Sequence, residues 1–392
     1  MKKLLTSAAV CGLVFAAAPA HADVDLELGG YFKGYGVYVD QDEDSTTPTG
    51  PVNDLDFIRN TEIHFTGETT LDNGLIVGFH LEADADVGTS NAGAVNDSFD
   101  VDESYAYFAG SWGRVNAGAE DGAAYLLQVA APSADSNIDG IRQFVNPVNY
   151  TTLLSAALVP AGLPIGANNS GGLDYDMDPA GKSDKLTYLS PVMNGFQLGL
   201  SYSPDTDNAN ENGIGLDDQE DTIGATYEAA VRYEGEFNGV GLTAGAGYSH
   251  GDNEADAVLP PVPAAVDSDD RQAWNAGLDL DFGAFGVGAA YVEDNGGVEG
   301  VGFDDEETWV VGVDYTTGAF KLGASYYDQE NSFGIDGVDA TRYSGGVTYT
   351  YGPGMTFRGS IGYVEHEATG INPDGGNDVD ATYVTLGTQI NF

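Results

Sequence analysis

Four side chains that could bind a transition metal lie in two neighbouring stretches of the sequence. Glu62 and His64 alternate in the first stretch, and His80 and Glu82 alternate in the second. Residues two apart in a β-strand point to the same face, and a tight turn at Asp72–Gly74 would place the two stretches opposite one another. Imidazole and carboxylate groups are ligands of zinc and related ions. The four could therefore bind a metal, although an ordinary polar lining of a sheet face is the simpler interpretation.

Two runs of alternating aspartates have the carboxylate spacing that could bind Ca²⁺ through oxygen ligands. These residues are Asp40, Asp42 and Asp44 in the first run and Asp174, Asp176 and Asp178 in the second. Neither run continues into the glycine and distal glutamate of the helix–loop–helix calcium signature. Acidic loop residues that are merely solvated are the alternative, and no other cofactor is expected.

Catalytic chemistry has little support in the sequence. His366 precedes Glu367, but the second histidine of a zinc-protease helix is missing. A serine nucleophile would need a base and an orienting group that the sequence cannot place. We therefore expect no catalytic residues, and an outer-membrane hydrolase is only a minor alternative.

The charge of the chain is strongly negative. It has 392 residues with 13 Lys plus Arg against 62 Asp plus Glu, for a formal net charge of −49. This excludes nucleic acid as a partner, because phosphate binding needs clustered basic residues. Disorder is disfavoured, since 42% of the residues are hydrophobic, including 22 Tyr and 17 Phe.

The N-terminus has the pattern of an export signal. Lys2 and Lys3 precede an apolar run over residues 4–18, and Ala20, His21 and Ala22 form an A-x-A cleavage site. The sequence predicts a signal peptide over 1–22 and a mature domain over 23–392. Cleavage would remove Cys11, so that no disulfide is expected in the mature chain.

Period-two alternation of apolar and small or polar residues extends over most of the mature chain. In four segments a Phe precedes a Tyr by six residues, which is roughly 20 Å along a strand at ~3.3 Å per residue. These pairs are Phe196 and Tyr202, Phe285 and Tyr291, Phe320 and Tyr326, and Phe357 and Tyr363. The spacing matches much of the apolar band, ~25 Å tall, of an outer-membrane barrel with aromatic girdles.

The connections between segments distinguish a membrane barrel from a soluble sandwich or barrel, which would show the same alternation. We count sixteen segments, which start near residues 25, 56, 75, 100, 113, 184, 195, 222, 239, 270, 285, 306, 318, 340, 355 and 380. The links alternate between tight turns and long loops, as in a barrel inserted from one side. The prediction is an all-β, sixteen-stranded antiparallel transmembrane barrel in which the strand ending at Phe392 pairs with the first.

One stretch and the terminal Phe392 resemble a known family. The stretch runs from Tyr107 through Trp112 and Arg114 to Gly122. With the sixteen segments, it is similar to the trimeric general diffusion porins of Gram-negative bacteria, nearest to those of photosynthetic bacteria. The resemblance implies a homotrimer in the cell outer membrane, in contact with lipid and lipopolysaccharide. It also implies a third outer loop, here 121–183, folded into the lumen as a constriction; a strand pair near 150–159 would make eighteen strands instead.

The strand residues that alternate with the outward apolar residues should line the pore. The basic residues among them are Lys33, Arg114, Lys185, Arg232, Arg271, Lys321, Arg342 and Arg358. The acidic residues of the wall are Glu62, Glu82, Asp84, Glu120, Glu228, Glu234, Asp279 and Asp314, and the third loop adds Asp121, Asp135, Asp139, Asp174, Asp176 and Asp178. By resemblance, an acidic loop would face a basic wall. Many relatives carry an inward Arg where this chain has Glu62, so this wall is less basic here.

The functional hypothesis is a water-filled, cation-preferring pore for passive diffusion of small hydrophilic solutes and ions. An excess of acids along a pore concentrates cations and repels anions. Three alternatives stay open: an unselective pore, a substrate-specific channel with a saturable solute site, and a structural protein that anchors the envelope.

Overall fold

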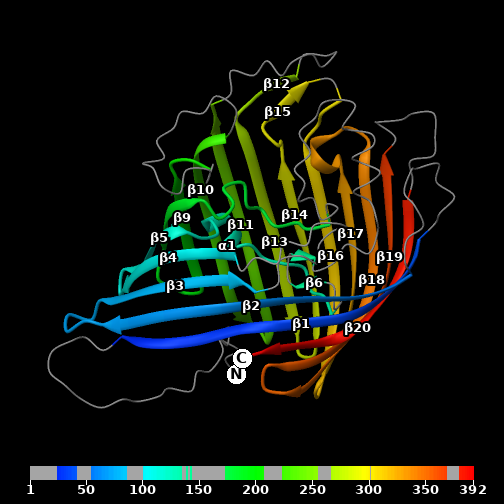
Figure 1. Cartoon of the computed structure of the whole chain (residues 1–392), viewed down its shortest axis with the longest axis horizontal. Coiled ribbons are helices and arrows are strands. Elements are labelled where there is room, and N and C mark those ends of the chain that lie inside the picture. Colours follow the sequence, from blue (N-terminus) through cyan, green and yellow to red (C-terminus); the bar gives the residue numbers. More distant parts are fainter. Residues whose placement is uncertain are drawn as a thin grey trace.

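The computed structural model describes residues 24–41, 54–85, 100–134, 138–139, 142–143, 173–206, 223–254, 266–300, 302–368 and 379–392. Sixteen antiparallel strands form a closed barrel (Figure 1). They are β1 (Asp25–Gln41), β2 (Leu55–Thr70), β3 (Ile76–Asp84), β4 (Asp100–Gly110), β5 (Gly113–Ala119), β8 (Asp184–Leu189), β9 (Phe196–Ser203), β10 (Ile223–Phe237), β11 (Val240–Asn253), β13 (Arg271–Phe282), β14 (Phe285–Asp294), β16 (Glu306–Thr317), β17 (Phe320–Glu330), β18 (Val338–Gly352), β19 (Met355–Ala368) and β20 (Val379–Asn391).

Each of these strands begins within two residues of the start predicted from alternation. The barrel closes where β1 pairs with β20, from Tyr31 opposite Asn391 to Gln41 opposite Ala381. The backbones of Gly30 and Phe392 extend this pairing through two reciprocal hydrogen bonds of 3.1 Å. The sixteen-stranded closed barrel is confirmed; the segment 150–159, where an additional strand pair was considered, lies outside the described residues.

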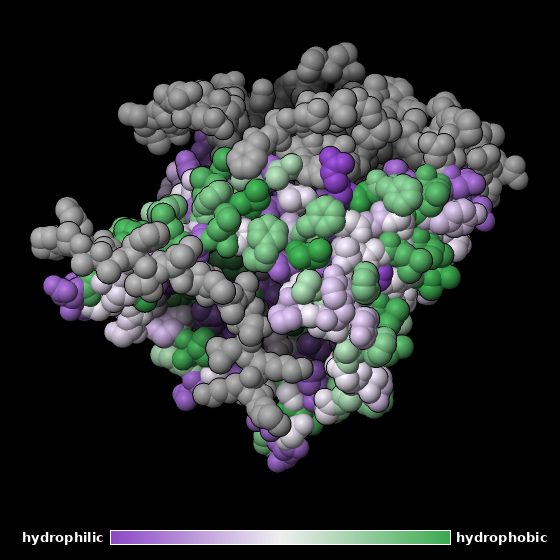
Figure 2. Space-filling view, turned by 60° about the horizontal axis from the view of Figure 1, so that its bottom comes forward, coloured by the Kyte–Doolittle hydropathy of each residue, from purple (hydrophilic) through white to green (hydrophobic). Residues whose placement is uncertain are grey.

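The outward face carries the predicted apolar residues. Phe196, Leu198 and Leu200 of β9 are each at least half exposed, whereas Gly199 and Ser201, which have the opposite parity, are buried. Figure 2 shows such hydrophobic side chains gathered on the outer surface of the barrel. A side of the sheet that exposes this much apolar surface is suited to hydrocarbon rather than water.

Aromatic rings on the outward face pack in two tiers. Near the tight turns the register brings Phe196 beside Tyr233 at 4.7 Å between ring centroids. Near the long connections Tyr291 packs between Trp274 and Trp309, at 4.7 and 4.4 Å. The Phe and Tyr spaced six apart therefore belong to different tiers, which is the arrangement of two interfacial girdles.

The interior of the barrel is partly packed. Buried apolar residues of inward parity, among them Val338, Val364 and Tyr383, form one cluster with Leu173 and Met177 from the long connection between β5 and β8. The strand number predicts a water-filled interior, and the wall parity alone does not reveal which part of that interior the connections fill.

Small elements accompany the barrel. The helix α1 (Ala123–Leu126) follows β5, and β6 (Ile138–Asp139) pairs with β7 (Arg142–Gln143). A short sheet joins β12 (Val266–Ser268) to β15 (Val298–Gly300), and η2 (Ser332–Gly334) lies between β17 and β18. No helix among the described residues is long and apolar enough to cross a membrane. The predicted signal peptide at 1–22 lies outside the described residues.

Candidate functional site

One part of the long third connection, residues 122–134, lies against the inward faces of β8 to β17. We call these inward faces the covered wall. The backbone amide of Ala123 donates to Ser201 Oγ at 2.8 Å, and that of Ala124 donates to Glu228 Oε2 at 3.1 Å. Asn275 Nδ2 donates to the carbonyl of Ala124 at 3.2 Å. Side chains of three strands thus satisfy the polar backbone of the helix α1, as burial requires.

Glycines of inward parity allow this close approach. A Cβ at Gly277 would lie 2.2 Å from the carbonyl oxygen of Val129, and one at Gly312 would lie 1.9 Å from that of Pro132. Other inward glycines that meet residues 123–134 are Gly199, Gly245, Gly247, Gly288 and Gly323. Because the strands carry no side chain at these positions, the connection packs directly on the barrel backbone.

The second described part of the connection, residues 173–183, packs on the first. Gln128 Nε2 donates to the carbonyl of Tyr175 at 2.7 Å, and the amide of Met177 donates to Gln128 Oε1 at 2.9 Å. Tyr327 on β17 donates its hydroxyl to the carbonyl of Asp174 at 3.3 Å. Leu173, Tyr175 and Met177 are buried, whereas Asp174 and Asp176 between them are partly exposed.

The base of the connection holds a buried group of charges. Lys185 on β8 donates its ammonium to the carbonyls of Glu120, Gly181 and Ser183. Burial raises the pKa of Glu120 to about 7, although Asn116 Nδ2 donates to its carboxylate at 2.6 Å. Lys185 therefore links the two ends of the connection through hydrogen bonds and does not project into the lumen as an isolated charge.

Asp121 and Asp178 belong to the same base. Asp121 is buried, and burial followed by the charge of Asp121 raises the pKa of Asp178 to about 7. Asp174, Asp176 and Asp178 do not converge within 4.8 Å as a ligand group in the part of the chain that is described. A calcium ion bound by these three aspartates stays a prediction.

The other predicted basic residues make local contacts. Arg232 donates to Glu234 at 2.8 Å and to the carbonyl of Gln128 at 3.0 Å. Further contacts of this kind are Lys321 with Asp314 at 2.8 Å, Arg271 with Asp294 at 2.7 Å, Arg358 with Thr356 at 3.2 Å, and the buried Arg342 at 5.0 Å from the ring centre of Tyr327. Much of the positive charge on the wall is thus offset by a carboxylate or by backbone carbonyls.

The inward faces of β1 to β5, which we call the charged wall, carry a row of rings. Tyr31, His64, His80 and Tyr105 follow one another across four strands, with ring centroids 6.4, 5.6 and 5.3 Å apart. The predicted residues Lys33 and Arg114 lie at the two ends of the row: Lys33 Nζ is 4.3 Å from the ring centre of Tyr31, and the Arg114 guanidinium is 3.9 Å from that of Tyr107. Cations at these distances are attracted by the ring faces.

Carboxylates lie along the same row. Lys182, from the third connection, contacts Asp102, and its Nζ lies 3.4 Å from Glu103 and 3.7 Å from Glu82. The pairing of β3 with β4 shifts register between Glu82 and Ala83, and such a bulge re-aims nearby side chains. Burial would lower the pKa of Lys182, but the surrounding carboxylates outweigh it and raise that pKa.

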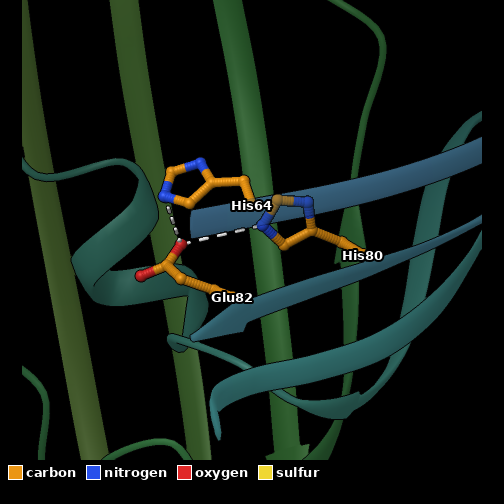
Figure 3. Close-up of side chains that lie close together, drawn as sticks. All are labelled: His64, His80 and Glu82. Atoms are coloured by element: carbon orange, nitrogen blue, oxygen red, sulfur yellow. Dashed lines mark ion pairs between the residues drawn. The ribbon is translucent and has the colours of Figure 1, made fainter. Parts of the chain in front are cut away.

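The two stretches singled out for metal-binding residues do meet on the charged wall. His64 lies directly opposite Glu82 in the register of β2 and β3, and Thr66 lies opposite His80. Figure 3 shows the two rings and the Glu82 carboxylate pointing toward one another from these strands. Glu62 contacts His64 on the same face. His64, His80 and Glu82 therefore meet as predicted, whereas Glu62 lies opposite Asp84 and joins them through His64.

Some predicted residues cannot be placed. Asp135 and the Asp42 to Asp44 pair lie outside the described residues, and the side chain of Asp139 is likewise outside the description. Sequence reasoning did not identify Lys182 as the cation of the charged wall. It also did not identify the inward glycines on which residues 123–134 pack, which we call the glycine seat. The signal for the second was present, since glycines recur at inward positions of β11, β13, β14, β16 and β17.

A closed barrel with an apolar outer band and a polar, charged inner wall defines a transmembrane β-barrel channel. The sequence matches the Gram-negative porin family over residues 6–369, and the chain therefore belongs to that family. It is a multi-pass barrel of the outer membrane, whose fold is that of a diffusion channel.

Solved porin structures have the same fold. The anion-selective porin from Comamonas acidovorans superposes with a TM-score of 0.60 at 17% identity. A porin refined at 1.8 Å resolution gives 0.57 at 19% identity, and a mutant form of the Rhodopseudomonas blastica porin gives 0.55 at 17% identity. Each comparison covers 94% of this chain and 100% of the other. No curated protein sequence gives a significant match.

Proposed function

We propose that this porin is a water-filled channel that prefers cations and admits small hydrophilic solutes and ions by passive diffusion. The observation that carries the preference is the charged wall. There, the carboxylates of Glu82, Asp102 and Glu103 lie around the ammonium of Lys182, and Glu62 and Asp84 lie opposite one another on β2 and β3.

The magnitude follows from simple electrostatics. One carboxylate attracts a monovalent cation ~10 Å away by about 0.4 kcal/mol in water. These five carboxylates exceed the three cations of the charged wall, Lys33, Arg114 and Lys182, by two charges. Two such charges would contribute about 0.8 kcal/mol, a roughly fourfold enrichment that added salt reduces. Arg271 and Lys321 form ion pairs with wall carboxylates, so these two cations contribute little net electric field in the lumen. The anion-selective Comamonas relative does not support a cation preference, so the proposal rests on the charges of this chain alone.

The connection 121–183 is proposed to narrow the lumen. This is supported by the contacts of residues 122–134 with the covered wall and by their glycine seat. A constriction built in this way would leave the charged wall facing the remaining opening. The predicted residues Asp174 and Asp176 would then add negative charge from the connection.

Membrane assembly is proposed on the basis of the family and the outer surface. We expect a homotrimer embedded in lipid and lipopolysaccharide, after cleavage of a signal peptide near Ala22. Outward residues of β1 and β2 such as Leu26 and Phe57 are about three-quarters exposed in the single chain and suit contact with lipid or another barrel.

The test is the reversal potential of purified protein in a planar bilayer under a tenfold KCl gradient. Cation preference predicts that the dilute side becomes positive at the reversal potential, because K⁺ diffuses to it ahead of Cl⁻, and that the channel gives large ohmic steps. An anion-selective potential would overturn the preference and leave the channel intact. Concentration-dependent block by one sugar would favour the substrate-specific alternative, and absence of any conductance would contradict the channel itself.

A further inference from the structure

We infer that His64, His80 and Glu82, with Glu62 in contact with His64, form a binding site for a divalent transition metal such as Zn²⁺ in the wall of the channel. The four residues come from adjacent positions of β2 and β3, and all are of inward parity. The inference goes beyond the diffusion function and does not depend on the cation preference.

The geometry is close to that of a tetrahedral site. His64 Nε2 lies 3.4 Å from Glu82 Oε2, and His80 Nε2 lies 3.7 Å from the same oxygen. One ligand atom from each of these three residues falls within 4.8 Å of the others. Zinc bound at about 2.0 to 2.1 Å separates its ligands by roughly 3.4 Å in a tetrahedron. Small rotations of the His80 side chain would therefore bring all three atoms to bonding distance.

Each proposed ligand is supported by a neighbour that leaves its metal-facing atom available. Tyr31 donates to Glu62 Oε2 at 2.7 Å, so that Oε1 remains directed at His64. Lys182 lies near Glu82 Oε1, on the side away from the shared Oε2. Thr66 Oγ1 is 3.0 Å from His80 Nδ1. This oxygen can accept a hydrogen bond from Nδ1–H, and in that tautomer Nε2 has a lone pair for a metal.

The two imidazoles of the cluster favour a cation that prefers nitrogen ligands. Two imidazoles select a transition metal over Ca²⁺, which takes oxygen ligands. The side chains of His64 and His80 keep 31% and 17% of their surface exposed, so that an ion can enter from the lumen. An ion bound between His64 Nε2 and Glu62 Oε1 would replace the direct contact that these two atoms make in the structure.

A second cluster offers a matched control. His250 Nε2 lies 3.2 Å from Asp252 and 3.9 Å from Asp270, but this group has one histidine, and its two carboxylates are about half exposed. It is the one other group of three such ligands among the described residues. A single imidazole with mobile carboxylates should bind Zn²⁺ weakly, and we propose no site there.

The experiment uses the full chain purified in detergent, with millimolar Ca²⁺ present to saturate acidic loops. Zn²⁺ is titrated by equilibrium dialysis, and Co²⁺ is added as a spectroscopic probe of tetrahedral coordination by nitrogen and oxygen. We expect one Zn²⁺ and one intense visible Co²⁺ spectrum per chain. The double variant His64→Gln, His80→Gln should lose both, Thr66→Val should bind about ten- to a hundredfold more weakly, and His250→Gln should bind as the unchanged chain does.

Equal Zn²⁺ affinity in the unchanged chain and the double variant would overturn the site, as would a Co²⁺ spectrum of octahedral type in the unchanged chain. Heat-dependent gel mobility shows whether the double variant folds. If it does not, the Thr66→Val variant decides the question, and a Zn²⁺ affinity equal to that of the unchanged chain overturns the proposal. Because binding is measured without a membrane, a failure of conductance leaves this result unaffected.

Discussion

The covered wall and the charged wall both consist of strands whose residues alternate between the inward and outward faces, yet their inward side chains differ. On β11 to β17 the inward positions are often glycine, so the third connection packs against them and its backbone is hydrogen-bonded. On β1 to β5 the inward positions carry rings and carboxylates instead. The size of the inward side chain therefore decides whether a wall supports a connection or presents charge.

The two walls also treat charge differently. Lys185 and Glu228 near the covered wall are buried and bound to backbone groups. Lys182 is surrounded by carboxylates on the charged wall. Charge on the covered wall is bound to the connection, whereas the proposed function assigns the charge of the charged wall to permeating ions.

The largest effect is expected from filling the seat of the connection. Gly312→Ala puts a methyl group 1.9 Å from the carbonyl oxygen of Pro132, which should cost about 1 to 3 kcal/mol through overpacking. Heat-dependent gel mobility should show a lower unfolding temperature, and the single-channel conductance should change as residues 122–134 leave the wall. The control is Gly345→Ala, whose new methyl would have its nearest neighbour at 3.6 Å; equal behaviour of the two variants would contradict the seat.

Raising the pH should loosen the base of the connection. The pKa of Glu120 and that of Asp178 are both raised to about 7 from ordinary values of 4.5 and 3.8. A carboxyl with a raised folded-state pKa contributes stability below its ordinary pKa, and this contribution is lost as the pH rises through about 7. From pH 6.5 to 8 the opening equilibrium should increase about fourfold for each group.

Hydrogen exchange of the amides in 121–134, corrected for the intrinsic pH dependence, measures this opening. Glu120→Gln combined with Asp178→Asn should flatten the dependence. An exchange rate that stays constant with pH in the unchanged chain would show that these carboxyls are already ionised below pH 6.5.

Neutralising the charged wall should weaken ion selection. Glu62→Gln combined with Glu82→Gln removes two negative charges and should lower the cation-to-anion permeability ratio by roughly two- to fivefold. Reversal potentials, measured with a chelator present, give this ratio. The matched control, Asp304→Asn with Asp336→Asn, removes two exposed charges from loops and should have a smaller effect on the permeability ratio. A larger effect of the control variant would assign ion selection to the loops at the entrance of the channel.

The smallest effect is expected at an offset cation. Lys321→Gln removes a charge that lies 2.8 Å from Asp314 and is 40% exposed. The cation-to-anion permeability ratio should rise by less than about twofold, because the pair contributes little net field. A larger change in the reversal potential would show that Lys321 acts independently of its partner.

The strands were predictable because each carries its own periodic signal. The six-residue spacing of Phe196 and Tyr202 already contains the two aromatic tiers, and the tight turns fix which strands are neighbours. The meeting of Glu62 and His64 with His80 and Glu82 was also predictable, since one short hairpin determines their register.

Lys182 and the glycine seat could not be placed in this way. Lys182 reaches Glu82 and Asp102 across some 80 to 100 residues of sequence, and no local pattern encodes that contact. The inward glycines were visible as small residues, but small inward residues fit either water or a packed backbone. The buried position of Lys185 likewise depends on the return of residues 173–183.

The sequence by itself therefore determined the barrel, its strand number and the two faces of its wall, because strand alternation and turn length are local properties. Only the tertiary structure decided which part of the wall is covered and which is charged. That distinction depends on where a long connection comes to rest, which is set by shape and hydrogen bonding between residues far apart in the chain.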